Sequence, residues 1–291
     1  MPGLKEVRIR IASVSSTKQI TSAMKMVSAS KLRKAQTAIV KLRPYANKLR
    51  ELLQNLGSSI ESADEGAYFK ARKVQNVLVI TVSSNRGLCG AFNANVIKAA
   101  VHHIEENYAT QFANGNVSLL CIGKKTSEFF SKRNYIIAGS HHELFDALTY
   151  DNTTVVAERL MKEFVTGKWD RIDIVYNQFK NAAMQNLTVE QFLPVPPITA
   201  GSSMQADYTF EPGRAEIVGD LVPKSLKVQF YKAVLDSYAS EHGARMTTMH
   251  KATDNAEELL KNLRITYNKA RQATITNEII EIVGGANALK G

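Results

Sequence analysis

Long apolar runs are absent from this sequence. None approaches the roughly 20 residues that a membrane-spanning helix needs, and the opening MPGLK lacks the apolar stretch of a signal peptide. Cysteine is scarce, and Cys89 and Cys121 have neither metal-ligand spacing nor the pattern of a disulfide framework. We expect an unexported chain without membrane spans and with reduced thiols. Its 44% hydrophobic residues are enough for a folded core.

Acidic residues are almost missing from the N-terminal part. Residues 1–50 hold seven Lys and five Arg against one acid, Glu6, a net of +11 in a chain whose total is +10. The remaining 241 residues therefore carry a net charge of −1. A basic arm of this kind is expected to face nucleic acid, anionic lipid or an acidic protein surface, and composition does not choose among them.

Residues 4–56 contain no glycine and a single proline, Pro44. Apolar residues recur there at alternating steps of three and four, which is the signature of a coiled-coil helix. The positions in register are Leu4, Val7, Ile11, Val14, Leu32, Ala35, Ile39, Leu42, Ala46, Leu49, Leu53 and Leu56. A polar stretch, residues 18–28, interrupts this seam, and the pattern resumes beyond Pro44, which predicts a bend there. We predict an N-terminal coiled-coil helix within residues 1–58.

The middle of the chain alternates between two patterns. Strands are predicted at 76–82, 117–122, 135–138 and 172–176, an edge strand at 187–193, and helices at 94–107, 124–131 and 153–166. Strands that alternate with helices indicate βαβ units and a mostly parallel sheet. We predict a Rossmann-like central α/β domain over residues 74–197, ended by the prolines at 194–197.

A second long helix is predicted to start near Pro223 and to run to about Val283, within a C-terminal segment at 210–287. Its seam consists of Val228, Tyr231, Leu235, Tyr238, Met249, Ala252, Ala256, Leu259, Leu263, Ala270 and Ala273, interrupted by His242, Arg245 and Thr266. Because neither helix is stable without burying its seam, we predict that both form a long antiparallel two-helix coiled coil. Matching the polar interruptions predicts that the numbers of facing residues sum to about 267, which leaves later residues unpaired.

Several fragments resemble catalytic motifs and fail on spacing. Gly87 and Gly90 follow a strand without the G-x-G-x-x-G pattern, and GKKT at 123–126 lacks the first glycine of a phosphate-binding loop, because Ser118 stands there. The adjacent histidines at 102–103 and 141–142 cannot share a helix face, and Cys89 has no identifiable base. We predict no catalytic residue, no cofactor, no metal site and no direct nucleotide binding.

The basic arm also fits nucleic acid poorly. Tyr45 is the one aromatic residue among the first fifty, and the charges follow the apolar seam instead of lying outside it. Protein is therefore the favoured partner. Two alternatives stay open: a basic coiled-coil nucleic-acid-binding protein, which predicts salt-sensitive DNA retention, and a nucleotide-dependent α/β enzyme, which predicts saturable nucleotide binding.

Three segments resemble signatures of one protein family. TSAMKMVSASKLRKA at 21–35 is similar to the N-terminal signature of the gamma subunits of F-type ATP synthases. SNRGLCGAFN at 84–93 resembles their central-domain motif, and ARQATITNEIIEIVGGA at 270–286 resembles their C-terminal signature. The three matches occur in the family's order and span essentially the whole chain, so the resemblance is to a bacterial member of that family.

This resemblance implies a rotor shaft. The paired terminal helices would stand inside a ring of alpha and beta subunits, with the α/β domain near the epsilon subunit and the membrane c-ring, at the cytoplasmic face of the bacterial inner membrane. Rotation of the ion-driven ring would change the beta-subunit catalytic sites, so the chain itself is not an enzyme. The paired cysteines of thiol-regulated members are missing. The implied beta-subunit contacts are Met24, Lys25, Arg245, Arg271, Gln272, Thr276 and Glu278, and the implied epsilon and c-ring contacts are Tyr208, Glu211 and Pro212.

Overall fold

The computed structural model describes residues 3–57, 67–70, 72–196 and 214–288. The chain falls into two compact units, residues 1–28 with 246–291, and residues 29–245. We name them the paired-helix unit and the sheet unit. Two long helices, α1 (Leu4–Gly57) and α6 (Arg214–Ala288), contribute residues to both units.

Both long helices predicted from the heptad pattern are present. α1 continues through Pro44, as the resumed seam indicated. The prediction that the second helix starts near Pro223 is wrong, because α6 begins nine residues earlier, at Arg214. A proline inside a helix removes one backbone donor and crowds the preceding turn. Here the burial of its neighbours Val222 and Leu226, each 2% exposed, outweighs that cost.

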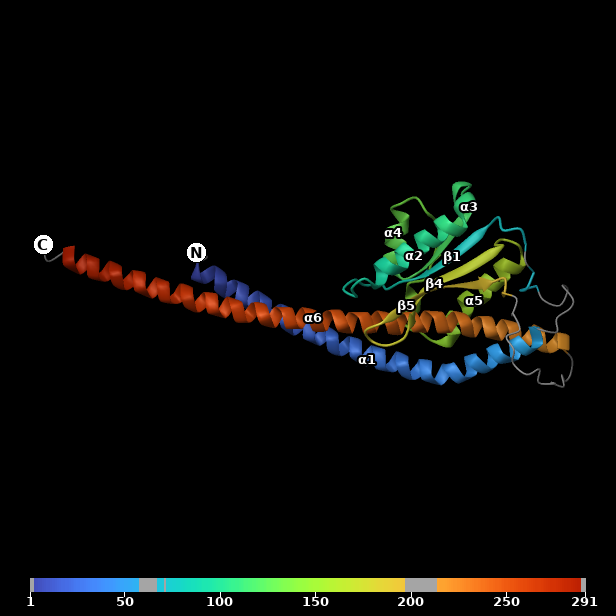
Figure 1. Ribbon diagram of the computed structural model, residues 1–291, viewed down its shortest axis with the longest axis horizontal. Coiled ribbons are helices and arrows are strands. Elements are labelled where there is room, and N and C mark those ends of the chain that lie inside the picture. Colours follow the sequence, from blue (N-terminus) through green and yellow to red (C-terminus); the bar gives the residue numbers. More distant parts are fainter. Residues whose placement is uncertain (1–2, 58–66, 71, 197–213, 289–291) are drawn as a thin grey trace. The chain divides into compact units, whose positions relative to one another are not determined.

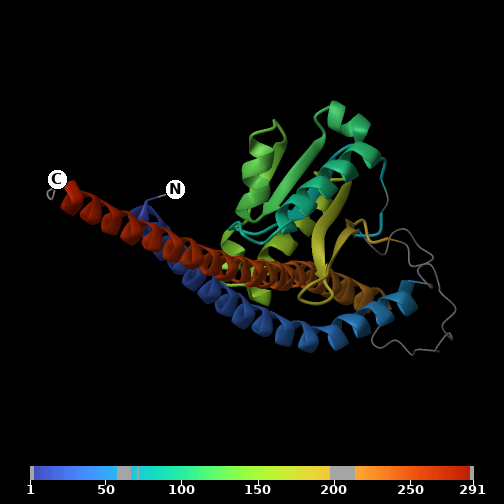
Figure 2. The same cartoon turned by 60° about the vertical axis from the view of Figure 1, so that its left-hand side comes forward.

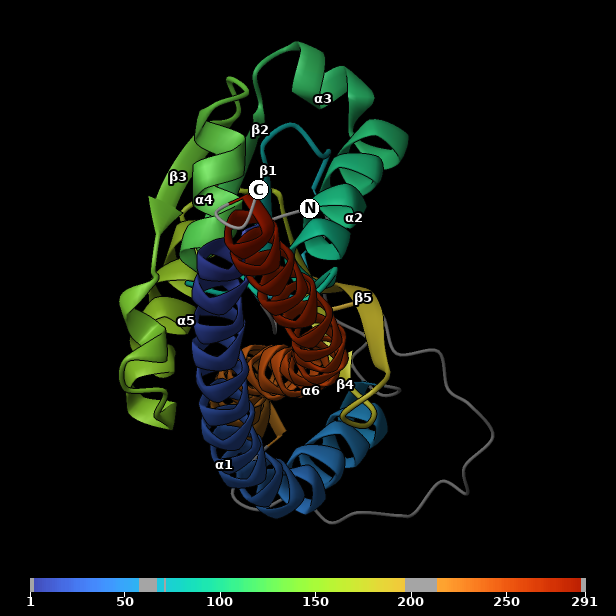
Figure 3. The same cartoon turned by 90° about the vertical axis from the view of Figure 1, so that its left-hand side faces the viewer.

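In the paired-helix unit, the start of α1 and the end of α6 lie side by side (Figure 3). Three of the polar contacts between their described side chains show how they pair. The Arg8 guanidinium donates to the Tyr267 hydroxyl at 3.0 Å, Lys18 Nζ lies 3.1 Å from a Glu257 carboxylate oxygen, and the hydroxyls of Thr21 and Thr253 are 2.9 Å apart. Because the residue number falls on one helix as it rises on the other, the pair is antiparallel, as predicted.

The predicted register of this pair is wrong by about one heptad. The facing pairs Arg8–Tyr267, Lys18–Glu257 and Thr21–Thr253 sum to 274 or 275 instead of 267. The polar interruption of α1 therefore does not oppose His242 and Arg245. A buried threonine pair accommodates it, and a polar pair of this kind can fix the register of two helices.

Beyond the start of α1, α6 continues as a single helix (Figure 1). With facing numbers that sum to 275, Leu4 lies level with residue 271, and every residue from 274 to 287 is exposed. The exposed set includes four large apolar side chains, Ile279, Ile280, Ile282 and Val283. The unpaired end thus begins near residue 274 instead of residue 267, about seven residues later than the sequence predicted.

The sheet unit contains a five-stranded sheet in the order β3-β2-β1-β4-β5. The strands are β1 (Val77–Val82), β2 (Val117–Ile122), β3 (Ile136–Ser140), β4 (Arg171–Phe179) and β5 (Gln185–Leu193), and the helices are α2 (Phe92–Asn107), α3 (Ala109–Ala113), α4 (Lys124–Ser131) and α5 (Tyr150–Val165), with a 3-10 turn at Glu143–Phe145. The pairs β1–β2, β2–β3 and β1–β4 are parallel, and β5 is antiparallel to β4. The predicted α/β fold with a mostly parallel sheet is confirmed, whereas α3 and the 3-10 turn were not predicted.

Different helices cover the two faces of the sheet (Figures 1 and 2). Side chains alternate along β1, so Val79 packs with Val96 of α2 on one face, while Ile80 points to the other. On that second face Ile80 belongs to a core that includes Phe164 of α5 and Phe230 of α6, both fully buried. α6 is therefore one layer of the sheet unit.

The second face also holds an unusual carboxyl group. Asp236 of α6 is 1% exposed, and its Oδ1 atom has no hydrogen-bond partner among the described residues. Burial raises its pKa from the ordinary 3.8 to about 6. Lys232 of α6 and Arg43 of α1 oppose this rise, and Glu190 of β5 adds to it.

We expect this carboxyl to destabilise the folded chain at neutral pH. Because its pKa is raised on folding, the folded chain binds the proton more tightly, so stability increases as the pH falls through about 6 toward 4. The shift corresponds to about 3 kcal/mol. Urea unfolding of the wild type and Asp236→Asn at pH 8 and pH 4.5 measures it. The wild type should gain relative to the variant at the lower pH, and an unchanged difference contradicts the prediction.

Candidate functional site

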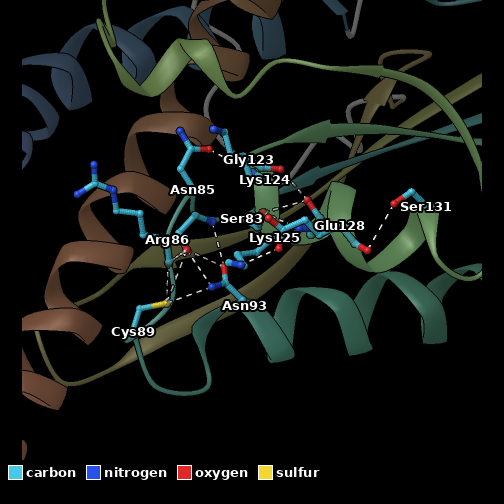
Figure 4. Close-up of polar contacts among 12 residues, drawn as sticks. Ser83, Asn85, Arg86, Cys89, Asn93, Gly123, Lys124, Lys125, Glu128 and Ser131 are labelled. Atoms are coloured by element: carbon cyan, nitrogen blue, oxygen red, sulfur yellow. Dashed lines mark hydrogen bonds and ion pairs between the residues drawn. The ribbon is translucent and has the colours of Figure 1, made fainter.

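The loop that follows β1 is held by its own polar side chains (Figure 4). The Ser84 amide donates to Asn93 Oδ1 at 2.9 Å, and the Ser84 hydroxyl donates to the Arg86 carbonyl oxygen at 2.6 Å. Asn93 Nδ2 donates to Cys89 Sγ at 3.2 Å. These residues lie in the segment 84–93 that resembled a family motif. The motif therefore forms a turn between β1 and α2 that is held by hydrogen bonds among its own residues.

Cys89 is not arranged as a nucleophile. Its side chain is 1% exposed, and burial raises the pKa of the thiol. A buried protonated thiol is a poor nucleophile. Burial also raises the pKa of Cys121, which lies inside β2.

The start of α4, where the sequence suggested a phosphate-binding loop, is already bonded to the loop after β1. The Lys124 amide donates to Asn85 Oδ1 at 3.1 Å, the Lys125 amide to the Ser84 carbonyl oxygen at 3.2 Å, and the Thr126 amide to the Ser83 hydroxyl at 3.1 Å. The amide groups that a phosphate would use at a helix N-terminus thus have protein acceptors.

We therefore expect the full-length chain to show no saturable ATP or ADP binding at micromolar concentration. A phosphate could bind here only by displacing three hydrogen bonds of the fold. Isothermal titration of the purified chain with each nucleotide and Mg²⁺ measures this. A one-to-one isotherm with a micromolar Kd would overturn the expectation.

Arg245 lies inside the sheet unit. Its side chain pairs with the Glu241 carboxylate and donates to the backbone carbonyl oxygens of Arg86, at 3.1 Å, and Gly87, at 3.3 Å. It is 8% exposed. Burial, and next the Arg245 charge, lower the pKa of His242 to about 3, so His242 is neutral at physiological pH. The seam interruption at 242–245 is therefore explained by contacts within this unit.

The histidine pairs have separate partners. His102 lies 3.1 Å from Glu106, His141 lies 2.9 Å from Glu143, and His103 Nε2 lies 2.8 Å from the buried Asp173 carboxylate. Among the described residues no three His, Cys, Asp or Glu side chains gather as a metal site would require. No helix formed by the described residues has the length and apolarity that a bilayer-spanning segment needs.

The other predicted contact residues lie in the paired-helix unit or outside the described residues. Met24 and Lys25 are partly exposed on α1. Four residues are exposed at the end of α6: Arg271, Gln272, Thr276 and Glu278. Tyr208, Glu211 and Pro212 lie outside the described residues. The structure thus brings four predicted beta-subunit contacts onto one exposed helix end and places Arg245 in the other unit.

Two serines of α6 were missed by the sequence interpretation. The Ser237 hydroxyl donates to the Val82 carbonyl oxygen at 3.3 Å, and the Ser240 hydroxyl donates to the Asn177 carbonyl oxygen at 3.0 Å. The sequence carried no strong signal for them, because Lys232, Asp236 and Glu241 are also polar in this stretch of helix.

Comparison with known proteins adds to this geometry. A family model described as ATP synthase matches residues 3–289. The ATP synthase gamma chain of Flavobacterium johnsoniae is 56% identical over 100% of both chains, and that of Cytophaga hutchinsonii is 52% identical over 99% of both. The chain belongs to the ATP synthase gamma chain family. The resemblance stated from the three sequence motifs is confirmed.

Solved structures agree on the fold. A chain from the Euglena gracilis mitochondrial ATP synthase in rotational state 3 matches with a TM-score of 0.71 and 24% identity, covering 98% of this chain and 94% of that one. A chain from the rotor of the same synthase, in rotational state 1, has a TM-score of 0.66 and 23% identity, covering 94% and 98%. The comparisons give no support to the nucleic-acid-binding alternative.

Proposed function

We propose that this chain is the central stalk, the rotor shaft, of a proton-translocating F-type ATP synthase, and that it has no catalytic activity of its own. Family membership over the whole length, at 52–57% identity to curated gamma chains, carries the proposal. The described fold suits the role. A 75-residue helix is a stiff element, and antiparallel pairing with α1 in the paired-helix unit stiffens it further.

The unpaired end of α6 is the part that would contact the catalytic head of alpha and beta subunits. Thr276 and Glu278 are exposed there, and Arg271 and Gln272 are exposed just before it, level with the start of α1. Met24 and Lys25 are accessible on α1. The basic arm, residues 1–50, fits an acidic beta-subunit loop, because opposite charges attract more strongly as water is excluded. Arg245 is the least accessible of the proposed contacts, since it is buried against residues of its own unit.

The remaining proposed contacts fall outside the described residues. Tyr208, Glu211 and Pro212 would contact the epsilon subunit and the c-ring. The chain would then lie peripherally at the cytoplasmic face of the bacterial inner membrane. ATP would be made on another chain, because the loops at 84–93 and 123–126 are bonded to their own fold and leave no phosphate cradle at the start of α4.

Reconstitution of the complex tests the function. Alpha and beta subunits from the same source are mixed with the full chain, and ATP hydrolysis and the rotation of a bead on the chain are recorded. We expect a stable complex in which the chain turns. The proposal is contradicted if alpha and beta assemble without taking up the chain, or if the bead stays fixed during hydrolysis.

One substitution tests the proposed contact surface. Arg271→Ala removes an exposed cation beside the unpaired end, and we expect it to lower the rate of ATP hydrolysis by the complex at least fivefold. Arg264→Ala removes another exposed cation, from the paired part of α6, and should change the rate less than twofold. Equal effects of the two substitutions would remove the support for a contact at Arg271.

A further inference from the structure

The strand order reverses between β1 and β4. From β1 the chain proceeds through α2 to β2 and β3 on one side, and α5 then leads back to β4 on the other side of β1. In doubly wound sheets, the crevice outside the carboxyl ends of the strands at such a point is where ligands bind. In this chain that position is bounded by the end of β1, the end of β4 and the loop after β1.

Helix α6 occupies this position. Ser237 donates to the carbonyl oxygen of Val82, the last residue of β1, and Ser240 donates to that of Asn177, near the end of β4. Both serine side chains are buried, at 1% and 0% exposure. Two hydroxyl groups of one helix therefore bond to the two strands that flank the crevice.

The next turns of α6 complete the contact. A Cβ atom on Gly243 would lie 3.2 Å from both Cα and the carbonyl oxygen of Ala182, so the helix backbone runs directly against the turn between β4 and β5. Arg245 then donates to the carbonyl oxygens of Arg86 and Gly87 in the loop after β1. Residues 237–245 of α6 thus contact every side of the crevice.

We propose that residues 237–245 of α6 fill the ligand crevice of the sheet as a built-in occupant, and that Ser237 and Ser240 are positioning residues that fix the rotation of α6 about its own axis. Burial of Phe230 and Val234 selects the face of α6 that meets the sheet but, being non-directional, would tolerate a small rotation within that face. Hydrogen bonds to carbonyl groups fixed in strands are directional and would not. The inference deepens the proposed function, because an α6 that cannot rotate about its own axis would transmit torque, and this torque role alone rests on that function.

Amide hydrogen exchange of the full-length chain tests the positioning itself. In Ser237→Ala/Ser240→Ala we expect the amides of residues 237–245 to exchange at least tenfold faster than in the wild type, while those of residues 222–234 change less than threefold. Ser225→Ala, at a half-buried serine of the same helix, is the control and should leave both segments unchanged. Unchanged exchange at 237–245 in the double variant overturns the proposal.

The second measurement uses the assembled complex in lipid vesicles and compares protons transported per ATP hydrolysed, at equal content of the chain. We expect the double variant to lose at least threefold in this ratio, with hydrolysis within twofold of the wild type. A ratio equal to that of the wild type overturns the torque role. If even the wild-type chain gives no coupled transport, the proposed function fails, and hydrogen exchange still decides the positioning. Should the double variant not assemble, Ser240→Ala alone is measured in the same way.

Discussion

Arg245→Ala is expected to lower the free energy of unfolding by about 3–5 kcal/mol, the usual effect of removing one member of a buried ion pair. Arg245 and Glu241 are each 9% exposed at the side chain, so the carboxylate left behind would be charged, buried and unpaired. The carbonyl oxygens of Arg86 and Gly87 would lose their donor as well. Urea unfolding of the full chain, followed by its helical signal, measures the loss.

The loss should depend on pH. Burial already raises the pKa of Glu241, and Arg245 is the largest influence that lowers it, so the substitution raises it further. A carboxyl whose pKa is raised on folding destabilises the fold above that pKa and ceases to do so as the pH falls through it. The loss should therefore be largest at neutral or alkaline pH and smaller in acid.

A double substitution is the matched control. Arg245→Ala/Glu241→Gln removes the unpaired charge, and we expect it to recover at least half of the stability lost at pH 7.5. Arg33→Ala, at an exposed cation of α1, should change the free energy of unfolding by less than about 0.5 kcal/mol. A loss for Arg245→Ala that is no larger than this control would show that the ion pair contributes nothing to the fold.

Gly123→Ala is expected to cost about 3 kcal/mol or more, because two separate obstacles meet at this residue. Its φ of +107° lies in a region that L side chains rarely adopt. An added Cβ would also overlap the backbone carbonyl oxygen of Ser83, an atom that cannot move without displacing the end of β1. Little of the variant should be recovered as soluble protein, and its unfolding midpoint in urea should fall.

Gly87→Ala provides the comparison. Gly87 lies in the neighbouring loop, and no atom lies within 4 Å of an added Cβ there. We expect a change below about 1 kcal/mol, of either sign. Equal recovery and equal midpoints for the two variants would show that the turn between β2 and α4 is tolerant, contrary to this structure.

Most helices and strands could be predicted from the sequence, because the apolar residues of each follow one simple pattern. The heptads of α1 and the continuous apolar run of β1 correspond to a paired helix and a strand buried on both faces. The register of the helix pair was wrong for a physical reason. His242 and Arg245 are polar residues in an apolar seam, and they look like an interruption of helix pairing, whereas they are buried within the sheet unit.

α6 has two apolar stripes that pack against different neighbours, and one heptad count could not predict both. Val228 and Leu235 belong to the predicted seam, but a second apolar stripe with Phe230 and Val234 packs in the core of the sheet unit. A helix that is apolar on most sides is a buried helix, and this stretch has that character. Which partner covers which stripe depends on long-range packing, which a local period does not specify. The same limit hid Ser237 and Ser240, whose acceptors lie in β1 and β4.

Because α6 is synthesised after all five strands, the sheet lacks one of its covering layers until late in translation. All five strands leave the ribosome before α6, yet one face of the sheet is completed only by Phe230 and its neighbours on that helix. Until synthesis reaches them, apolar side chains such as Ile80 lack part of their cover, and a nascent chain in that state is prone to aggregation. The sheet therefore acquires its native core only near the end of translation. A message truncated before α6 should yield an insoluble product instead of a smaller folded domain.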